Sequence, residues 1–126
     1  AWTTITWEQA NQKIEDYNTI AALVFHTNYY IARVLEILKG GALNISDTFS
    51  FNATIISSSK DWELLKEKSF NDAQEFASTV ERMNDTQLLK FSKAEKYGTW
   101  YRNLNGIVEH GYYHLGQIWL IKKQLL

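Results

Sequence analysis

The stretch GIVEHGYYHLGQIWLIKKQLL, residues 106–126, decides the fold of this chain. It predicts one long helix, beginning at Trp100 or Tyr101, that contains two of the three histidines, His110 and His114. On a helix, residues four positions apart lie one turn apart on the same face. Two imidazoles placed in this way can bind one metal ion from one side.

The third histidine, His26, belongs to a second predicted helix that covers residues 19–39. Thr19 or Asn18 is a suitable N-cap, and the apolar residues that follow recur at helical spacing. Gly40-Gly41 then ends the helix. At 100° per residue, His26 lies at the edge of the apolar stripe.

The residues around His26 divide into two faces of this helix. Tyr30 and Arg33 lie on the same face as His26, and Asn28 lies on the far side, which we expect to face solvent. Arg33 either binds a carboxylate or reaches solvent, and its long side chain favours solvent.

A third long helix is predicted over residues 60–83, capped by Ser58 or Ser59. Its expected inner stripe consists of Trp62, Leu65, Ala73, Phe76, Ala77, Val80 and Met83. Residues 42–59 have no clear period and predict a long loop that crosses from one end of the fold to the other. Residues 85–99 predict a second connection, partly extended at 88–91, and residues 7–13 predict a short helix.

The three long helices leave a helical bundle one helix short. A fourth is expected from the short N-terminal segment, from sequence upstream or from another chain. The last helix is apolar on most sides, because Tyr101, Val108, Tyr112, Leu115 and Trp119 lie opposite the histidines. Such a helix is either central in the bundle or covered by a partner subunit. We expect a single domain over residues 1–126.

Composition and charge exclude several classes of function. The 126 residues have a net charge of −1 and no long basic run, so nucleic-acid binding by phosphate neutralisation has little support. No apolar run approaches a membrane span, and no signal peptide is visible, so we expect no membrane contact and a cytoplasmic location. The absence of cysteine excludes disulfides, thiolate ligands and a cysteine nucleophile.

The positions of the three histidines together suggest a common role. A lone histidine on an apolar face is usually a core residue with a hydrogen-bonded ring, and spacing alone leaves that alternative open beside a metal site. Burying three imidazoles would leave several ring nitrogens in need of partners, and one metal ion satisfies three of them at once. Separate core histidines and a single metal site therefore remain the two readings.

Two familiar metal sites do not fit the pattern. A di-iron bundle requires Glu-x-x-His pairs, and no histidine here has a glutamate three residues before it. The HExxH metalloprotease motif fails because Gly111 follows His110. Haem between two of the histidines would leave the third without a role. What remains is a neutral three-histidine site with open positions for water or substrate.

Two stretches of the chain resemble the DinB-like superfamily of metal-binding four-helix bundles. They are LVFHTNYYIARVL around His26 and YGTWYRNLNGIVEHGYYHLGQIWLIKK around His110 and His114, of which residues 109–118 are the most specific part. The resemblance covers roughly residue 3 to the end. It implies that the three histidines are the metal ligands and that the first helix of the family is short or missing in this chain.

The resemblance also implies a class of activity. Characterised members are metal-dependent thiol transferases that use low-molecular-weight thiols, or hydrolases, and dimers are common. We therefore expect a divalent ion such as Zn, Ni, Fe or Mn, a small-molecule substrate and a homodimer. Tyr30 and Gln117 are candidate catalytic helpers, because both should point toward the metal. A hydrolase and a non-catalytic metal-binding or dimerisation module remain the alternatives.

Overall fold

The computed structural model describes residues 4–41, 47–51, 55–90, 92 and 95–125, and within these ranges it contains helices and no strand. The long helices are α2 (Ile20–Leu38), α4 (Ser59–Glu81) and α6 (Trp100–Leu125). The short ones are α1 (Trp7–Asn11), α3 (Asp47–Ser50), α5 (Asp85–Leu88) and the 3₁₀ turn η1 (Glu95–Tyr97). The prediction of an all-α fold is confirmed. No helix in these ranges has both the length and the apolar content that a membrane crossing requires.

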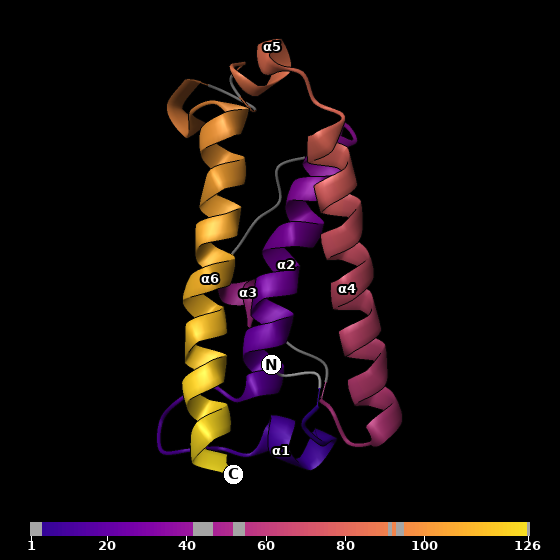
Figure 1. The fold of residues 1–126 in the computed structure, drawn as a ribbon, viewed down its shortest axis with the longest axis vertical. Coiled ribbons are helices and arrows are strands. Elements are labelled where there is room, and N and C mark those ends of the chain that lie inside the picture. The colour runs from indigo at the N-terminus through magenta and orange to yellow at the C-terminus, as the bar shows by residue number, and fades with distance from the viewer. Residues whose placement is uncertain (1–3, 42–46, 52–54, 91, 93–94, 126) are drawn as a thin grey trace.

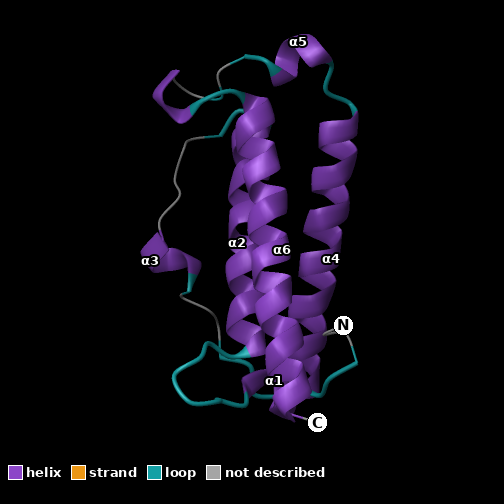
Figure 2. Cartoon of the chain, turned by 60° about the vertical axis from the view of Figure 1, so that its left-hand side comes forward, coloured by secondary structure: helices purple, strands orange, loops and turns teal. Residues whose placement is uncertain are grey.

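Helix α2 occupies the centre of the molecule, with α4 on one side and α6 on the other (Figure 1). The chain runs in the same direction along α2 and α4 and in the opposite direction along α6 (Figure 1). The short helix α3 stands beside this group of long helices, and α1 lies at the end where α4 begins (Figure 2). Because α2 and α6 are antiparallel neighbours, residues near the middle of each helix face one another.

The helix ends follow from local sequence, as predicted. The Thr19 hydroxyl accepts a hydrogen bond from the backbone N–H of Ala22 at 3.1 Å, and Ser58 caps α4 in the same way. Gly40, with a φ of +93°, occupies the left-handed conformation that ends α2.

The hydrophobic core is concentrated at the end of the bundle that α1 closes. Trp62 of α4 is almost completely buried there, and its indole N–H donates to the carbonyl of Ile5 at 3.1 Å. Ile20 and Leu23 of α2 and Ile121 of α6 complete this cluster. Helix α1 has only five residues, so it covers this end without supplying a fourth long helix.

The expected inner stripe of α4 is confirmed only in part. Only Trp62 is buried, whereas Phe76 and Val80 are half-buried and Ala73 and Ala77 are exposed. The physical reason is that α4 packs mainly against α2 and barely contacts α6. Most of the stripe therefore has no second helix against it.

The outer face of α6 is also uncovered within this chain. Tyr112 is 71% exposed and Trp119 is 47% exposed, so α6 is not the central helix of the fold. That alternative is wrong, because α2 holds the central place (Figure 1).

Three smaller expectations also fail. Asn28, expected to face solvent, is buried, because α4 covers that face and Asp72 accepts a hydrogen bond from its amide at 2.8 Å. The predicted loop over residues 42–59 contains α3. The extended segment expected at residues 88–91 begins inside α5, which ends at Leu88, and residue 91 lies outside the described residues.

Candidate metal centre

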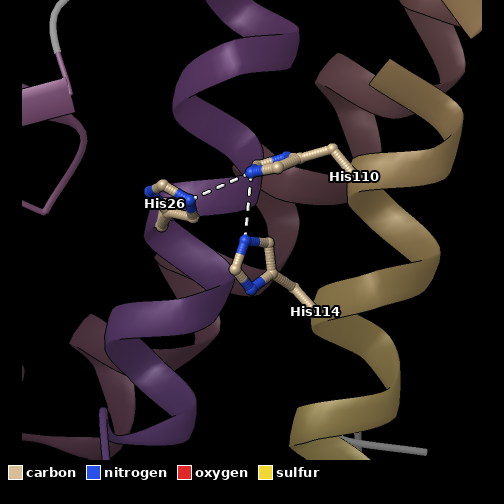
Figure 3. A group of neighbouring side chains, drawn as sticks. All are labelled: His26, His110 and His114. Carbon is tan, nitrogen blue, oxygen red and sulfur yellow. Dashed lines mark hydrogen bonds between the residues drawn. The ribbon is translucent and has the colours of Figure 1, made fainter. Parts of the chain in front are cut away.

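The three histidines meet between α2 and α6 (Figure 3). His26 extends from α2, and His110 and His114 extend from successive turns of α6. The rings of His26 and His114 are 6% and 8% exposed, and His110 is half-buried. The antiparallel packing of two helices therefore brings together residues that are 84 positions apart in sequence.

The Nε2 atoms of all three rings point to one place. His110 Nε2 lies 3.0 Å from His26 Nε2 and 3.0 Å from His114 Nε2. One ligand atom from each ring lies within 4.8 Å of the others, and this is the only group of three or more histidine, aspartate or glutamate residues in the described part of the chain that can hold a metal ion. The predicted convergence of the histidines is confirmed.

The outward-facing nitrogens of two rings have protein partners. His114 Nδ1 lies 2.6 Å from Gln117 Oε1, and His26 Nδ1 lies 3.0 Å from the hydroxyl of Ser50. A carboxamide oxygen only accepts hydrogen bonds, so this contact favours the tautomer in which His114 has its proton on Nδ1 and a lone pair at Nε2. When Ser50 accepts in the same way, His26 also presents a lone pair at Nε2.

Protons limit how the three rings can contact one another. With both neighbours in the Nδ1–H tautomer, the single N–H of a neutral His110 can lie in only one of its two Nε2 contacts. At least one of the two close nitrogen contacts then has no hydrogen between its atoms unless a ring takes up an extra proton and buries a charge. A divalent cation at the meeting point would accept all three lone pairs.

The distances suit such an ion. Nitrogen ligands at about 2.0–2.1 Å in a tetrahedral site are about 3.3 Å apart, and the two short contacts here are 3.0 Å. Small rotations of the rings would therefore be enough to bring these nitrogens to the spacing that a bound ion requires. The donor set of three neutral imidazoles suits Zn, Ni and Fe.

Aromatic rings surround the three ligands. Tyr30 places its ring edge-on to His26 at 5.2 Å and to His110 at 4.9 Å between ring centroids. Phe51 stacks on His26 at 3.9 Å, and Tyr113 meets His114 edge-on at 5.1 Å. These contacts restrict the rotation of the ligand rings.

Five residues of this centre were predicted from the sequence, whereas Ser50, Phe51 and Tyr113 were not. Tyr30 and Gln117 both lie against ligand rings, and a direct catalytic role for either stays a prediction. Ser50 and Phe51 were missed because they come from a segment without helical periodicity, where spacing carries no information about facing.

Two charged residues lie apart from the centre. Arg33, expected to reach solvent, is 30% exposed and pairs with Glu36 at 2.6 Å. Glu109, next to His110 in sequence, is exposed. Neither belongs to the group that can hold a metal.

One cavity has Gln117 in its lining. It measures about 430 Å³ and is lined by Asp16, Tyr17, Asn18, Leu23, Gln117, Leu120, Ile121 and Gln124. A larger cavity of about 610 Å³ lies between α2 and α4 and contains no histidine. The donor atoms of the three histidines mark the candidate site, because the size of a cavity does not show which chemical groups it can bind.

Comparisons with protein-family models, with curated proteins and with solved structures returned no match for this chain. The assignment of a function therefore rests on the geometry of the histidine centre.

Proposed function

We propose that this protein is a metal-dependent transferase that joins a low-molecular-weight thiol to a small electrophile. The observation that carries the proposal is the meeting of three Nε2 atoms, two of whose contacts measure 3.0 Å. One divalent ion at this point would bind all three nitrogens at once.

The donor count supports a catalytic site over a structural one. Structural zinc sites use four protein ligands, whereas catalytic sites use three and keep a position open. In the described part of the chain, three histidines form the group and no aspartate or glutamate joins it. The open position is what a substrate requires, and a closed structural ion is disfavoured.

Thiol transfer suits this site better than hydrolysis does. His26, His110 and His114 are neutral ligands, so they would leave a bound divalent ion its full charge, and such an ion would lower the pKa of a thiol or a water bound to it. Hydrolysis also benefits from a positioned carboxylate base, and Glu109, the acidic residue next to the ligands in sequence, is exposed. A thiol transfer depends mostly on positioning, for which the cavity beside Gln117 offers room for a small molecule.

Two further residues of the chain would keep the three histidines oriented toward a bound ion. Gln117 fixes the tautomer of His114, and Tyr30 packs against both His26 and His110, so the three lone pairs stay aligned. We infer that both residues act mainly by orienting ligands.

We also propose that the protein is a DinB-like bundle. The helical fold and the placement of one histidine on α2 and two on α6 support this assignment. The five-residue α1 agrees with a first helix that is short in this chain.

A second copy of this chain is the partner we propose for the outer face of α6. Exposed apolar residues recur there at spacings of seven, four, three and four: Tyr101, Val108, Tyr112, Leu115 and Trp119. Such spacing suits helix–helix contact. Light scattering of the wild type and of Tyr112→Lys tests this, with a dimer expected only for the wild type. A wild type that stays monomeric at high concentration would reject the homodimer.

The direct test of the metal site compares His110→Ala with Glu109→Ala. The two residues are neighbours on α6, but only His110 reaches the centre. Purified without chelator, the wild type and Glu109→Ala should contain one divalent ion per chain, and His110→Ala should lose most of it. Equal metal content in all three proteins would show that the site is misassigned.

The test of the chemistry uses cobalt in place of the native metal. Small thiols should change the visible spectrum of the cobalt protein, because a thiolate that enters the open position alters the ligand field. A panel of thiols that leaves the spectrum unchanged, while cobalt remains bound, would remove the support for thiol transfer and favour a non-catalytic role.

A further inference from the structure

Helix α3 reaches the histidine centre from outside the bundle. Its last residue, Ser50, is completely buried, and its hydroxyl lies 3.0 Å from His26 Nδ1. The next residue, Phe51, stacks on the same ring at 3.9 Å with the two planes only 7° apart. Phe49, one position earlier, is 56% exposed.

We propose that α3 is a positioning element of the metal centre, in which Ser50 selects the Nδ1–H tautomer of His26 and Phe51 fixes the plane of its ring. Metal binding and the seating of α3 against His26 then stabilise each other. This inference rests on the proposed metal site. It adds Ser50 and Phe51 to that site and couples α3 to metal binding.

The contacts of Ser50 and Gln117 have the same form. Each places an oxygen against the Nδ1 atom of one ligand. When both oxygens accept, both rings direct an Nε2 lone pair toward the centre, where it can bind a cation. Without Ser50, the buried Nδ1 of His26 has lost this acceptor, and the proton can move to Nε2. A metal must then displace that proton before it can bind.

Phe51 acts on the orientation of the His26 ring, whereas Ser50 acts on which of its nitrogens carries the proton. A phenyl ring parallel to the imidazole restricts rotation about the last side-chain bond of His26, which is otherwise broad. At 42% exposure, Phe51 contributes little to the core of the protein, so its removal should leave the fold intact. The variant Phe51→Ala can therefore show a loss of metal affinity that is not caused by a loss of the fold.

Thermodynamic linkage makes the coupling measurable from both sides. If seating of α3 raises metal affinity by some factor, metal binding must favour the seated state by the same factor. Loss of a residue that orients a metal ligand typically lowers affinity by about 10–100-fold. We expect the lower end for Ser50, because a hydroxyl is a weaker acceptor than a carboxylate.

The first experiment measures Zn²⁺ affinity by competition with a chromophoric chelator. Ser50→Ala should bind about tenfold more weakly than the wild type. Phe51→Ala should bind between about twofold and tenfold more weakly, and Phe49→Ala, on the same short helix, should match the wild type. Equal affinities for all four proteins would overturn the proposal.

The second measurement reads the tautomer directly. Long-range ¹H–¹⁵N spectra of the metal-free wild type should show His26 with its proton on Nδ1, and Ser50→Ala should show a mixture or the Nε2–H form. A purely structural role for Ser50 would leave the tautomer unchanged. That result would overturn the assignment of Ser50 even if its affinity fell.

The third measurement tests the reverse direction of the coupling by limited proteolysis with chymotrypsin. The bond after Phe49 lies inside α3, so cleavage requires α3 to leave its seat. Saturating Zn²⁺ should slow this cleavage about tenfold relative to cleavage after the exposed Tyr97, and Phe51→Ala should show less protection. Equal protection at both bonds would count against the coupling.

The outcomes distinguish this inference from the metal site itself. If His110→Ala leaves Zn²⁺ binding unchanged, the metal site fails and α3 has nothing to position. If His110→Ala abolishes binding while Ser50→Ala and Phe51→Ala behave like Phe49→Ala, the metal site stands and the role of α3 is wrong.

Discussion

The seam between α2 and α6 and the apolar stripe of α4 were both expected to be interior, and the stripe is buried much less completely than the seam. Along the seam, His26 and His114 are buried and their ring nitrogens have close partners. On α4, Trp62 is buried while Ala73 and Ala77 are exposed. An apolar stripe in a sequence shows that a face can be buried, and only packing shows whether it is.

The largest expected effect compares a buried and an exposed aromatic residue on α4. Trp62→Ala should lower the free energy of unfolding by about 3–5 kcal/mol, because it empties the core and removes the hydrogen bond to Ile5. Phe70→Ala, at 52% exposure on the same helix, should change it by less than about 0.5 kcal/mol. Urea unfolding measures both, and similar losses would show that α4 is covered by a partner.

The seam should gain stability from metal. At a free Zn²⁺ concentration of about 100 times the dissociation constant, linkage predicts about 2.7 kcal/mol of stabilisation. His114→Ala should remove this gain, whereas Tyr112→Ala, on the exposed face of α6, should retain it. Thermal unfolding with and without Zn²⁺ provides the measurement, and an identical response in both variants would contradict the seam as the binding site.

Asn28 tests the polar contact between α2 and α4. Its buried amide donates to the carboxylate of Asp72, which Lys68 also contacts. Asn28→Ala should lower the free energy of unfolding by about 1–3 kcal/mol, as expected for a hydrogen bond to a charged group. Asn71→Ala, an exposed neighbour of Asp72, is the control. No loss in the Asn28 variant would mean that this contact does not hold the two helices together.

The smallest effect concerns the first turn of α4 and depends on pH. Hydrogen bonds from the backbone and the hydroxyl of Ser57 lower the pKa of Asp61 below its usual range. Since the folded-state pKa is the lower one, the stabilisation is complete above the unfolded value of about 3.9 and is lost as the pH falls through the folded value.

Urea unfolding of the wild type and Asp61→Asn between pH 7 and pH 2.5 checks this effect. The advantage of the wild type should shrink as the pH falls below about 4 and should be smaller in high salt. A difference that stays constant with pH would show that the carboxylate charge contributes nothing.

Much of the local structure could be predicted from the sequence. Thr19 and Ser58 cap their helices as expected, and Gly40 ends α2, because caps depend on residues close in sequence. The four-residue spacing of His110 and His114 predicted their shared face for the same reason. Position at the edge of an apolar stripe was enough to direct His26 toward them.

Contacts between segments that are far apart in the sequence could not be predicted. Ser50 and Phe51 lie in a segment without periodicity, so nothing in their spacing indicated that they would reach His26. Asn28 was assigned to solvent because its face is polar, and the nearby Asp72 of α4 made that face an interior one. In both cases the partner comes from a distant part of the chain.

The sequence by itself determined the three long helices, most of their ends and the presence of three imidazoles on two core-facing stripes, because these depend on neighbours within a few residues. Only the tertiary structure decided that α2 is central, that α4 stays half-covered and that α3 seats a serine and a phenylalanine against His26. Those outcomes depend on which helices run side by side, and the packing of the whole chain sets that arrangement.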